Sequence, residues 1–137
     1  DLGGVLADVS PAGLTALDGV LPPTWSRANP VDIIGDADAA RYATALEILL
    51  SDEGNDAVLL LNVPTAMASA SAAAEAVAAV VEKHRRTAYR KKPVFAVWVG
   101  GDEASESVFG KAGIPHFATE AEAIQGFTHL VRWREAQ

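Results

Sequence analysis

Two continuous apolar segments constrain the fold of this 137-residue chain more than any other feature of its sequence. They are "DAVLLLNVP" at 56–64 and "KPVFAVWVGG" at 92–101. Neither segment alternates apolar and polar residues, which is typical of strands that are buried on both faces of a parallel sheet. The segment between them, "SASAAAEAVAAVVEKHRRTAYR", consists mostly of strong helix formers, with Ser69 or Ser71 as its N-cap. A strand, a helix and a strand at this spacing predict a right-handed crossover unit.

The flanking segments continue this alternation of helices and strands. Gly54 stands where the C-terminal cap of a helix favours positive φ, and short strands are expected at 3–10, 31–34 and 114–118. Further helices are expected after Ser10 and Pro11, after Asp36 or Asp38, after Asp102, and after Thr119, which forms a capping box with Glu122. The pattern predicts an α/β fold with three layers and a doubly wound, mainly parallel sheet, flavodoxin-like or Rossmann-like, in a single domain spanning 1–137.

A flavodoxin-like domain normally opens with a central strand and its helix, and here that pair is missing or replaced by "DLGG". The chain starts at Asp1 without Met and ends on a helical pattern, so we expect a fragment of a larger multidomain protein. Loss of the first strand and helix would expose apolar sheet surface. We therefore expect association through that edge, with other parts of the parent or as a homo-oligomer.

Composition argues against several classes of function. The net charge of −7 argues against a nucleic-acid partner, and no apolar run reaches the roughly 18 residues of a membrane span. The chain has no cysteine, which excludes disulfides and thiolate chemistry and suits a cytoplasmic protein. No GxGxxG or GxxxxGK[ST] motif occurs, and the three histidines form no cluster with carboxylates. A nicotinamide cofactor, a P-loop and a metal site are therefore not expected.

The candidate ligand-binding residues follow the predicted strands. Open parallel sheets bind ligands beyond the carboxyl ends of their strands, and here each such loop leads into a helix N-terminus, which favours anions. A phosphate or phosphoryl group suits this edge. The alternative is that these are ordinary turns, in which glycine gives backbone freedom and Asp or Ser caps the helix. The residues are Gly35 and Asp36 in one loop, Asn62, Pro64 and Thr65 in another, and Gly100, Gly101 and Asp102 in a third.

The basic segment "KHRRTAYRKK" at 83–92 has two interpretations. It could bind phosphate or contact another domain or subunit. The alternative is that its cations offset the dipole at a helix C-terminus. The segment leads into the start of a strand, opposite the ligand edge, which favours the structural interpretation. Of the tryptophans, Trp98 is expected in the core and Trp25 is a candidate interface residue.

Four ordered blocks of the sequence resemble the third domain of NDP-forming acyl-CoA synthetases, relatives of succinyl-CoA synthetase and ADP-forming acetyl-CoA synthetase. The blocks are "LPPTWSRANPVDIIGDA", "DAVLLLNVPTA", "KPVFAVWVGG" and "AGIPHFATEAEAIQGFTHLVRWREAQ", and the resemblance covers essentially the whole chain. The same multidomain body also occurs fused to a GNAT domain in Pat-type protein lysine acetyltransferases. The stretches "PPTWSRANPVDIIGDA" and "HLVRWREAQ" look especially similar to those fusions.

The resemblance implies a flavodoxin-like ligase domain in an enzyme that reversibly converts acid, CoA and ATP to acyl-CoA, ADP and phosphate. It implies partner domains that bind CoA, carry a phosphohistidine and form an ATP-grasp fold. CoA, ATP or ADP, and Mg are implied for the parent and none for this fragment. The family's phosphohistidine loop and Gly-rich turn are absent here, so no catalytic residue is carried over. The residues that match the family are Asn29, Pro30, Asp32, Gly35 and Asp36, which would line the edge facing the active-site interface.

Two other functions stay open at this point. The first is a non-catalytic module that senses acyl-CoA or nucleotide in a GNAT-fused lysine acetyltransferase. The second is a plain interaction scaffold. In the ligase interpretation, this fragment is not expected to be catalytic by itself.

Overall fold

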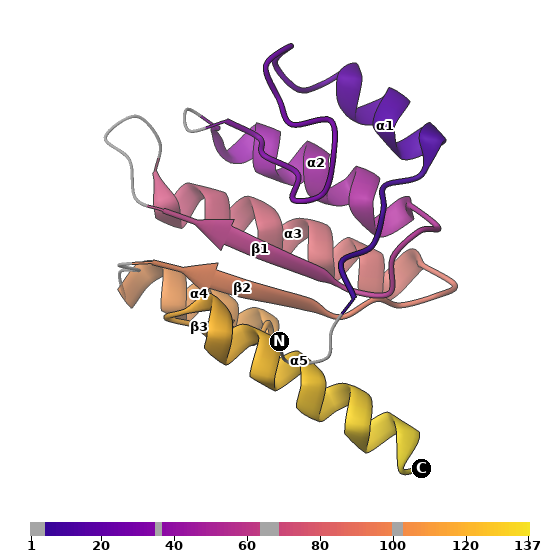
Figure 1. The fold of residues 1–137 in the computed structure, drawn as a ribbon. Helices are drawn as coiled ribbons and strands as arrows, with labels where there is room; N and C mark the ends of the chain where they lie inside the picture. Colours follow the sequence, from indigo (N-terminus) through magenta and orange to yellow (C-terminus); the bar gives the residue numbers. More distant parts are fainter. Residues whose placement is uncertain (1–4, 35–36, 64–68, 100–102) are drawn as a thin grey trace.

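The computed structural model describes residues 5–34, 37–63, 69–99 and 103–137. Within these ranges the chain forms helices and strands in alternation after an initial pair of helices (Figure 1). The elements are α1 (Pro11–Asp18), α2 (Ala39–Ser51), β1 (Val58–Asn62), α3 (Ala70–Thr87), β2 (Val94–Trp98), α4 (Glu103–Ala112), β3 (His116–Phe117) and α5 (Glu120–Glu135). The predicted strand–helix–strand unit around 56–101 is confirmed.

The sheet is parallel, with the strand order β1-β2-β3. Helices α2, α3 and α4 cover one face, which we call the inner face, and α5 lies on the opposite, outer face (Figure 1). Helix α1 packs on the far side of α2. The predicted three-layer α/β architecture is therefore confirmed.

The main core lies between the inner face and these helices. Val94, Ala96 and Trp98 alternate along β2 and point toward α3 and α4, as the two-residue period of a strand requires. The Trp98 and Phe109 rings meet edge to face with their centroids 4.7 Å apart, a favoured aromatic geometry. On α3 the buried positions are alanines and valines, and these small side chains let the helix lie close to the sheet. The expected core position of Trp98 is confirmed.

Four helices begin at side-chain N-caps that the sequence predicted. Ser10 caps α1, Asp38 rather than Asp36 caps α2, Ser69 rather than Ser71 caps α3, and Thr119 caps α5. Each side chain accepts a hydrogen bond from the backbone N–H three residues later, which satisfies one of the unpaired donors of the first turn. Asp102, the predicted cap of α4, lies outside the described residues.

Two predicted strands are not formed: residues 5–10 and 31–34 have no strand conformation. A strand needs a neighbour to pair with, and in the described sheet neither segment pairs with β1. Val31, Ile33 and Ile34 instead pack with Trp25 in a second cluster beside α1 and α2. Trp25 is buried there, so its assignment as an interface residue is wrong.

Gly54 does not end α2 with positive φ, as the sequence had suggested. The helix ends at Ser51, its C-cap Asp52 is extended, and Gly113 is the positive-φ glycine of the described residues. Gly54 is needed for another reason, because a Cβ there would lie 2.7 Å from the carbonyl oxygen of Asp8. Among the described helices, none is long and apolar enough to cross a bilayer.

Candidate functional site

The carboxyl ends of β1 and β2 lie at one edge of the sheet, and α2, α3 and α4 begin on the same side (Figure 1). Asn62 and Trp98 are the last residues of their strands and neighbours in register. The Trp98 indole Nε1 donates to the carbonyl of Ala70 over 3.2 Å, which fastens the start of α3 to the end of β2. This edge therefore combines strand ends with helix N-termini, the arrangement that binds ligands in open parallel sheets.

Asn62 is buried at this edge in a polar contact that the sequence did not reveal. Its Nδ2 donates to the Tyr42 hydroxyl over 3.0 Å, and that hydroxyl lies 3.4 Å from the Leu61 carbonyl, to which it donates. Burial raises the pKa of Tyr42, and the bond from Asn62 offsets part of the rise. The Oδ1 atom of Asn62 is buried and has no hydrogen-bond partner among the described residues. The helical pattern had placed Tyr42 only on the core face of α2.

Asn29, Pro30 and Asp32 lie in a loop that is held by contacts with the N-terminal segment and within the loop itself. The Asn29 side chain donates to the Ala7 carbonyl over 2.7 Å, and the Asn29–Pro30 peptide bond is cis. Asp32 Oδ1 accepts from the Ile34 N–H over 2.9 Å, a local turn that side chains of this type favour. These contacts favour the structural alternative for the described part of this loop.

The described candidate residues are not joined in one polar network. Within the described part of the chain, no hydrogen bond or ion pair joins Asn62 to Asn29 or Asp32. The remaining candidates lie outside the described residues; they are Gly35, Asp36, Pro64, Thr65, Gly100, Gly101 and Asp102.

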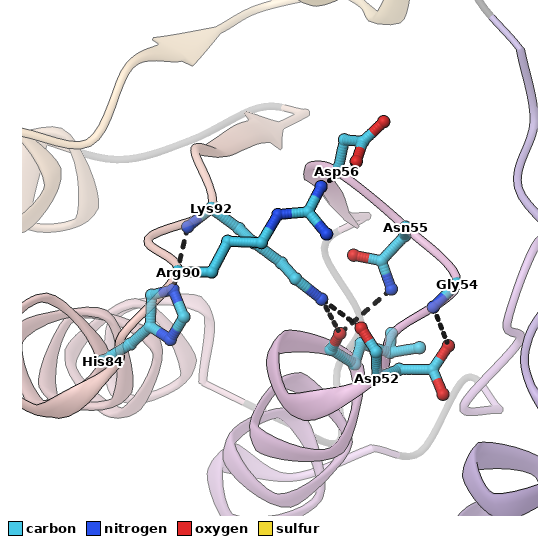
Figure 2. A network of polar contacts seen from close by, with 8 residues as sticks. Asp52, Gly54, Asn55, Asp56, His84, Arg90 and Lys92 are labelled. Atoms are coloured by element: carbon cyan, nitrogen blue, oxygen red, sulfur yellow. Dashed lines mark hydrogen bonds and ion pairs between the residues drawn. The ribbon is translucent and has the colours of Figure 1, made fainter.

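A second polar group lies at the opposite edge, where β2 begins (Figure 2). Lys92 is only 8% exposed, and its Nζ donates to the carbonyls of Asp52 and, over 3.4 Å, Leu49 at the end of α2. Figure 2 also shows Asn55, whose amide donates to the Leu49 carbonyl over 3.0 Å. A cation that binds the last carbonyls of a helix satisfies them and opposes the dipole.

The Asp52 carboxylate connects this group to α1. It accepts from the hydroxyl of Ser10, from the Ser10 N–H over 3.3 Å, and from the Gly54 N–H over 3.3 Å. Burial by itself would raise the pKa of Asp52, but these hydrogen bonds and the Lys92 charge outweigh it and lower the pKa. The carboxylate therefore stays ionised and holds α1 against the end of α2.

His84 completes the group from α3. Its Nε2 accepts the backbone N–H of Lys92 over 3.0 Å, so the ring must be neutral at that nitrogen (Figure 2). Burial, followed by the positive charges of Lys92, Arg85 and Lys91, lowers the pKa of His84. Arg90 pairs with Asp56 nearby. These contacts join secondary-structure ends, so they favour the structural interpretation of the basic segment.

No described residues form a metal centre, since no three His, Cys, Asp or Glu side chains in those ranges are grouped to hold an ion. The carboxyl edge of the sheet is thus the better candidate for ligand binding. Next to the strand ends, its described groups are the amide of Asn62, the hydroxyl of Tyr42 and the first turn of α3, which carries no acidic residue. The other two helix starts at this edge are acidic, since Asp38 caps α2 and Glu103 and Glu106 lie in the first turn of α4.

Comparison with known proteins gives consistent matches. A family model described as "Ligase-CoA domain" matches residues 1–135. An ADP-forming acetate–CoA ligase of Archaeoglobus fulgidus is 34% identical over 115 residues, 82% of this chain and 15% of that protein. An ADP-forming 4-hydroxybutyrate–CoA ligase of Nitrosopumilus maritimus is 26% identical over 121 residues, 87% of this chain and 16% of that protein.

A solved structure shares the fold over nearly the whole chain. It is the dinucleotide-forming acetyl-coenzyme A synthetase 1 of Ca. Korarchaeum cryptofilum in complex with phosphate and ADP. Its TM-score is 0.79 at 27% sequence identity, over 93% of this chain and 27% of that one. The chain therefore spans well under a third of each of these three proteins.

Proposed function

Because the chain belongs to the family of ligase-CoA domains, we propose that it is one domain of an NDP-forming acyl-CoA synthetase. The whole protein would join an acid to CoA with ATP, releasing ADP and phosphate, and would run the reaction in reverse. Residues 1–137 would form a single domain of this cytoplasmic enzyme and would not be catalytic alone. The relatives' names support a ligase rather than an acetyltransferase or a scaffold.

The observation that carries this proposal is the convergence of helix starts at the carboxyl edge of the sheet. Backbone N–H groups and helix dipoles hold a phosphoryl group without any positive side chain. The chain's part in the reaction would be to present the first turn of α3, next to Asn62, to a phosphoryl group held by another domain. Thr65, Gly100, Gly101 and Asp102 are proposed to extend this surface, together with the loop from Asn29 to Asp36.

CoA, ATP or ADP, and Mg would be bound mainly by other domains. The described residues offer no cluster of carboxylates for Mg, so we assign no metal ligand among them. The domains that bind CoA, carry a phosphohistidine and form an ATP-grasp fold are the proposed partners. The acyl group is left open, since the two ligases named above differ in it.

The test is the reverse reaction of the full-length polypeptide that contains this chain. Acyl-CoA, ADP, Mg and inorganic phosphate are mixed, and ATP is measured by a coupled hexokinase assay. We expect ATP that depends on phosphate and on an acyl-CoA such as acetyl-CoA or 4-hydroxybutyryl-CoA, and no ATP after deletion of residues 1–137. A folded full-length protein that forms no ATP from a panel of acyl-CoAs would refute the proposal.

A test on the chain itself uses inorganic phosphate as the probe. We expect phosphate to shift the backbone amide NMR signals of Ala70 and Ser71 more than those of Glu120 and Ala121 at the start of α5. Helix α5 is also a long helix capped by a hydroxyl side chain, but Glu120 and Glu122 lie in its first turn, whereas the first turn of α3 has no acidic residue. The control is therefore the E120Q/E122Q variant, in which the first turn of α5 is uncharged like that of α3. Equal shifts at both helices would show that phosphate binds helix ends without selectivity.

A further inference from the structure

The outer face of β1 is apolar, and no described helix covers its side chains. Leu59, Leu61 and Val63 alternate along this strand and its end, so their side chains share one face of the sheet. They are 37%, 43% and 63% exposed. Their neighbours in register, Phe95 for Leu59 and Val97 for Leu61, lie on the same face of β2 and are buried.

Helix α5 accounts for this difference because it covers β2 and β3 but not β1. The Phe127 ring of α5 meets Phe95 edge to face at 5.9 Å between centroids. Gly126 of α5 lies against the Phe117 ring of β3. In Figure 1, α5 runs along the side of the sheet where β3 lies, away from β1. The cover therefore stops one strand short of the edge.

The composition of β1 is that of a strand covered on both faces. Val58 and Leu60 pack into the inner core, and Leu59, Leu61 and Val63 repeat the apolar pattern on the outer side. A parallel strand with this pattern normally lies between two layers of helices. Contiguous exposed apolar side chains on a folded domain mark a surface that another element buries.

We propose that the outer face of β1 binds an amphipathic helix from a part of the parent polypeptide outside residues 1–137, and that this helix lies next to α5. The inference rests on one part of the proposed function, namely that the chain is a domain of a longer protein. The docked helix would continue the layer that α5 begins, with an apolar stripe against Leu59, Leu61 and Val63. A second copy is the weaker occupant, because both copies carry a net charge of −7.

The chain contains no cysteine, so single introduced cysteines can report exposure at chosen positions. Leu61→Cys is made both in the 137-residue chain and in the full-length polypeptide, and its labelling rate with a maleimide is measured under native conditions. Tyr89→Cys is the control, because Tyr89 is fully exposed on the α3–β2 connection. The full-length polypeptide without the introduced cysteine gives the background, and Leu59→Cys repeats the test at a second position.

We expect labelling at position 61 to be at least about 10-fold slower in the full-length polypeptide than in the 137-residue chain, with no change at position 89. Equal rates at position 61 in the two proteins would overturn the proposal. Protection in the 137-residue chain that grows with protein concentration would also overturn it, in favour of a second copy. If ATP is formed while position 61 stays reactive, this inference fails alone; if position 61 is protected and no ATP is formed, the proposed reaction fails alone.

Discussion

Strands β1 and β2 have similar compositions but different surroundings. All five residues of β2 are buried, because α3 and α4 cover its inner face and α5 covers its outer face. In β1 the ends are buried, whereas Leu59 and Leu61 are exposed on the outer face. An apolar run therefore shows that a strand is suited to burial on both sides, but its neighbours decide whether that burial occurs.

The largest expected effect is a direct test of this comparison at two residues in register. Val97→Asp would place a carboxylate under α5, where the side chain is fully buried, and should cost at least about 3 kcal/mol of unfolding free energy. Leu61→Asp, its neighbour on β1, should cost less than about 1 kcal/mol in the 137-residue chain. Urea unfolding followed by circular dichroism measures both. Similar losses for the two variants would mean that β1 is covered as well.

The start of β2 is joined to the end of α2 by the buried side chain of Lys92. Lys92→Met keeps most of the side-chain volume but removes the donor to the carbonyls of Leu49 and Asp52, so we expect a loss of about 1.5–3 kcal/mol. Lys91→Met is the control, because Lys91 is exposed, and it should change stability by less than about 0.5 kcal/mol. Thermal or urea unfolding distinguishes them, and equal effects would refute the role of Lys92.

The cover that α5 provides for β2 can be weakened at Gly126. A Cβ at this position would lie 2.9 Å from the Phe117 ring, so Gly126→Ala should push α5 from the sheet and cost about 1 kcal/mol. Gly110→Ala in α4 is the matched control, because a Cβ there meets no atom within 4 Å. It should stabilise the protein by about 0.5–1 kcal/mol through helix propensity. Stabilisation by both changes would show that α5 packs loosely on β3.

The smallest expected effect concerns the pH dependence of stability that arises from His84, which accepts a hydrogen bond from Lys92 just before β2. The folded-state pKa of His84 is lowered, so the neutral ring and its bond from Lys92 persist above the unfolded pKa of about 6.5. Stability should then fall by about 1 kcal/mol as the pH drops from 7.5 to about 5, since the unfolded chain binds the proton more readily.

His84→Gln should remove this dependence near pH 6, because an amide oxygen accepts a hydrogen bond at any pH. His129→Gln should leave it unchanged, since His129 is exposed on α5. The lowered pKa of Asp52 adds a separate loss of stability below about pH 4 in both variants. Urea unfolding over a pH series gives all three results, and an unchanged dependence in His84→Gln would exclude this histidine as its source.

The sequence predicted those parts of the fold that depend on nearby residues. The strands β1 and β2, the α3 crossover and the caps at Ser10, Asp38, Ser69 and Thr119 all follow from local periodicity or from contacts three residues apart. Burial on both faces was predicted for both strands and is confirmed only for β2. Segments 5–10 and 31–34 were predicted wrongly as strands, because a local pattern does not reveal whether a pairing partner exists.

The candidate site was predicted less completely for the same reason. The predicted position of Asn62 at the carboxyl end of a strand is confirmed, but its partner Tyr42 lies 20 residues earlier, and no local signal connects the two. Asp52 likewise binds Ser10 from 42 residues away. The loop from Asn29 to Asp32 had a turn composition that suited a ligand site and an ordinary structural turn equally, and the described contacts favour the second.

Lys92 also has a consequence for the order in which the chain folds. The donor that satisfies the Asp52 carbonyl at the end of α2 lies 40 residues later in the chain, beyond the whole of β1 and α3. Closing such a long stretch is slow relative to forming a helix, so the last turn of α2 is completed only after β2 has joined β1. During synthesis, the carbonyl of Asp52 at the end of α2 would therefore lack its donor until the second half of the chain, which contains Lys92, had emerged from the ribosome.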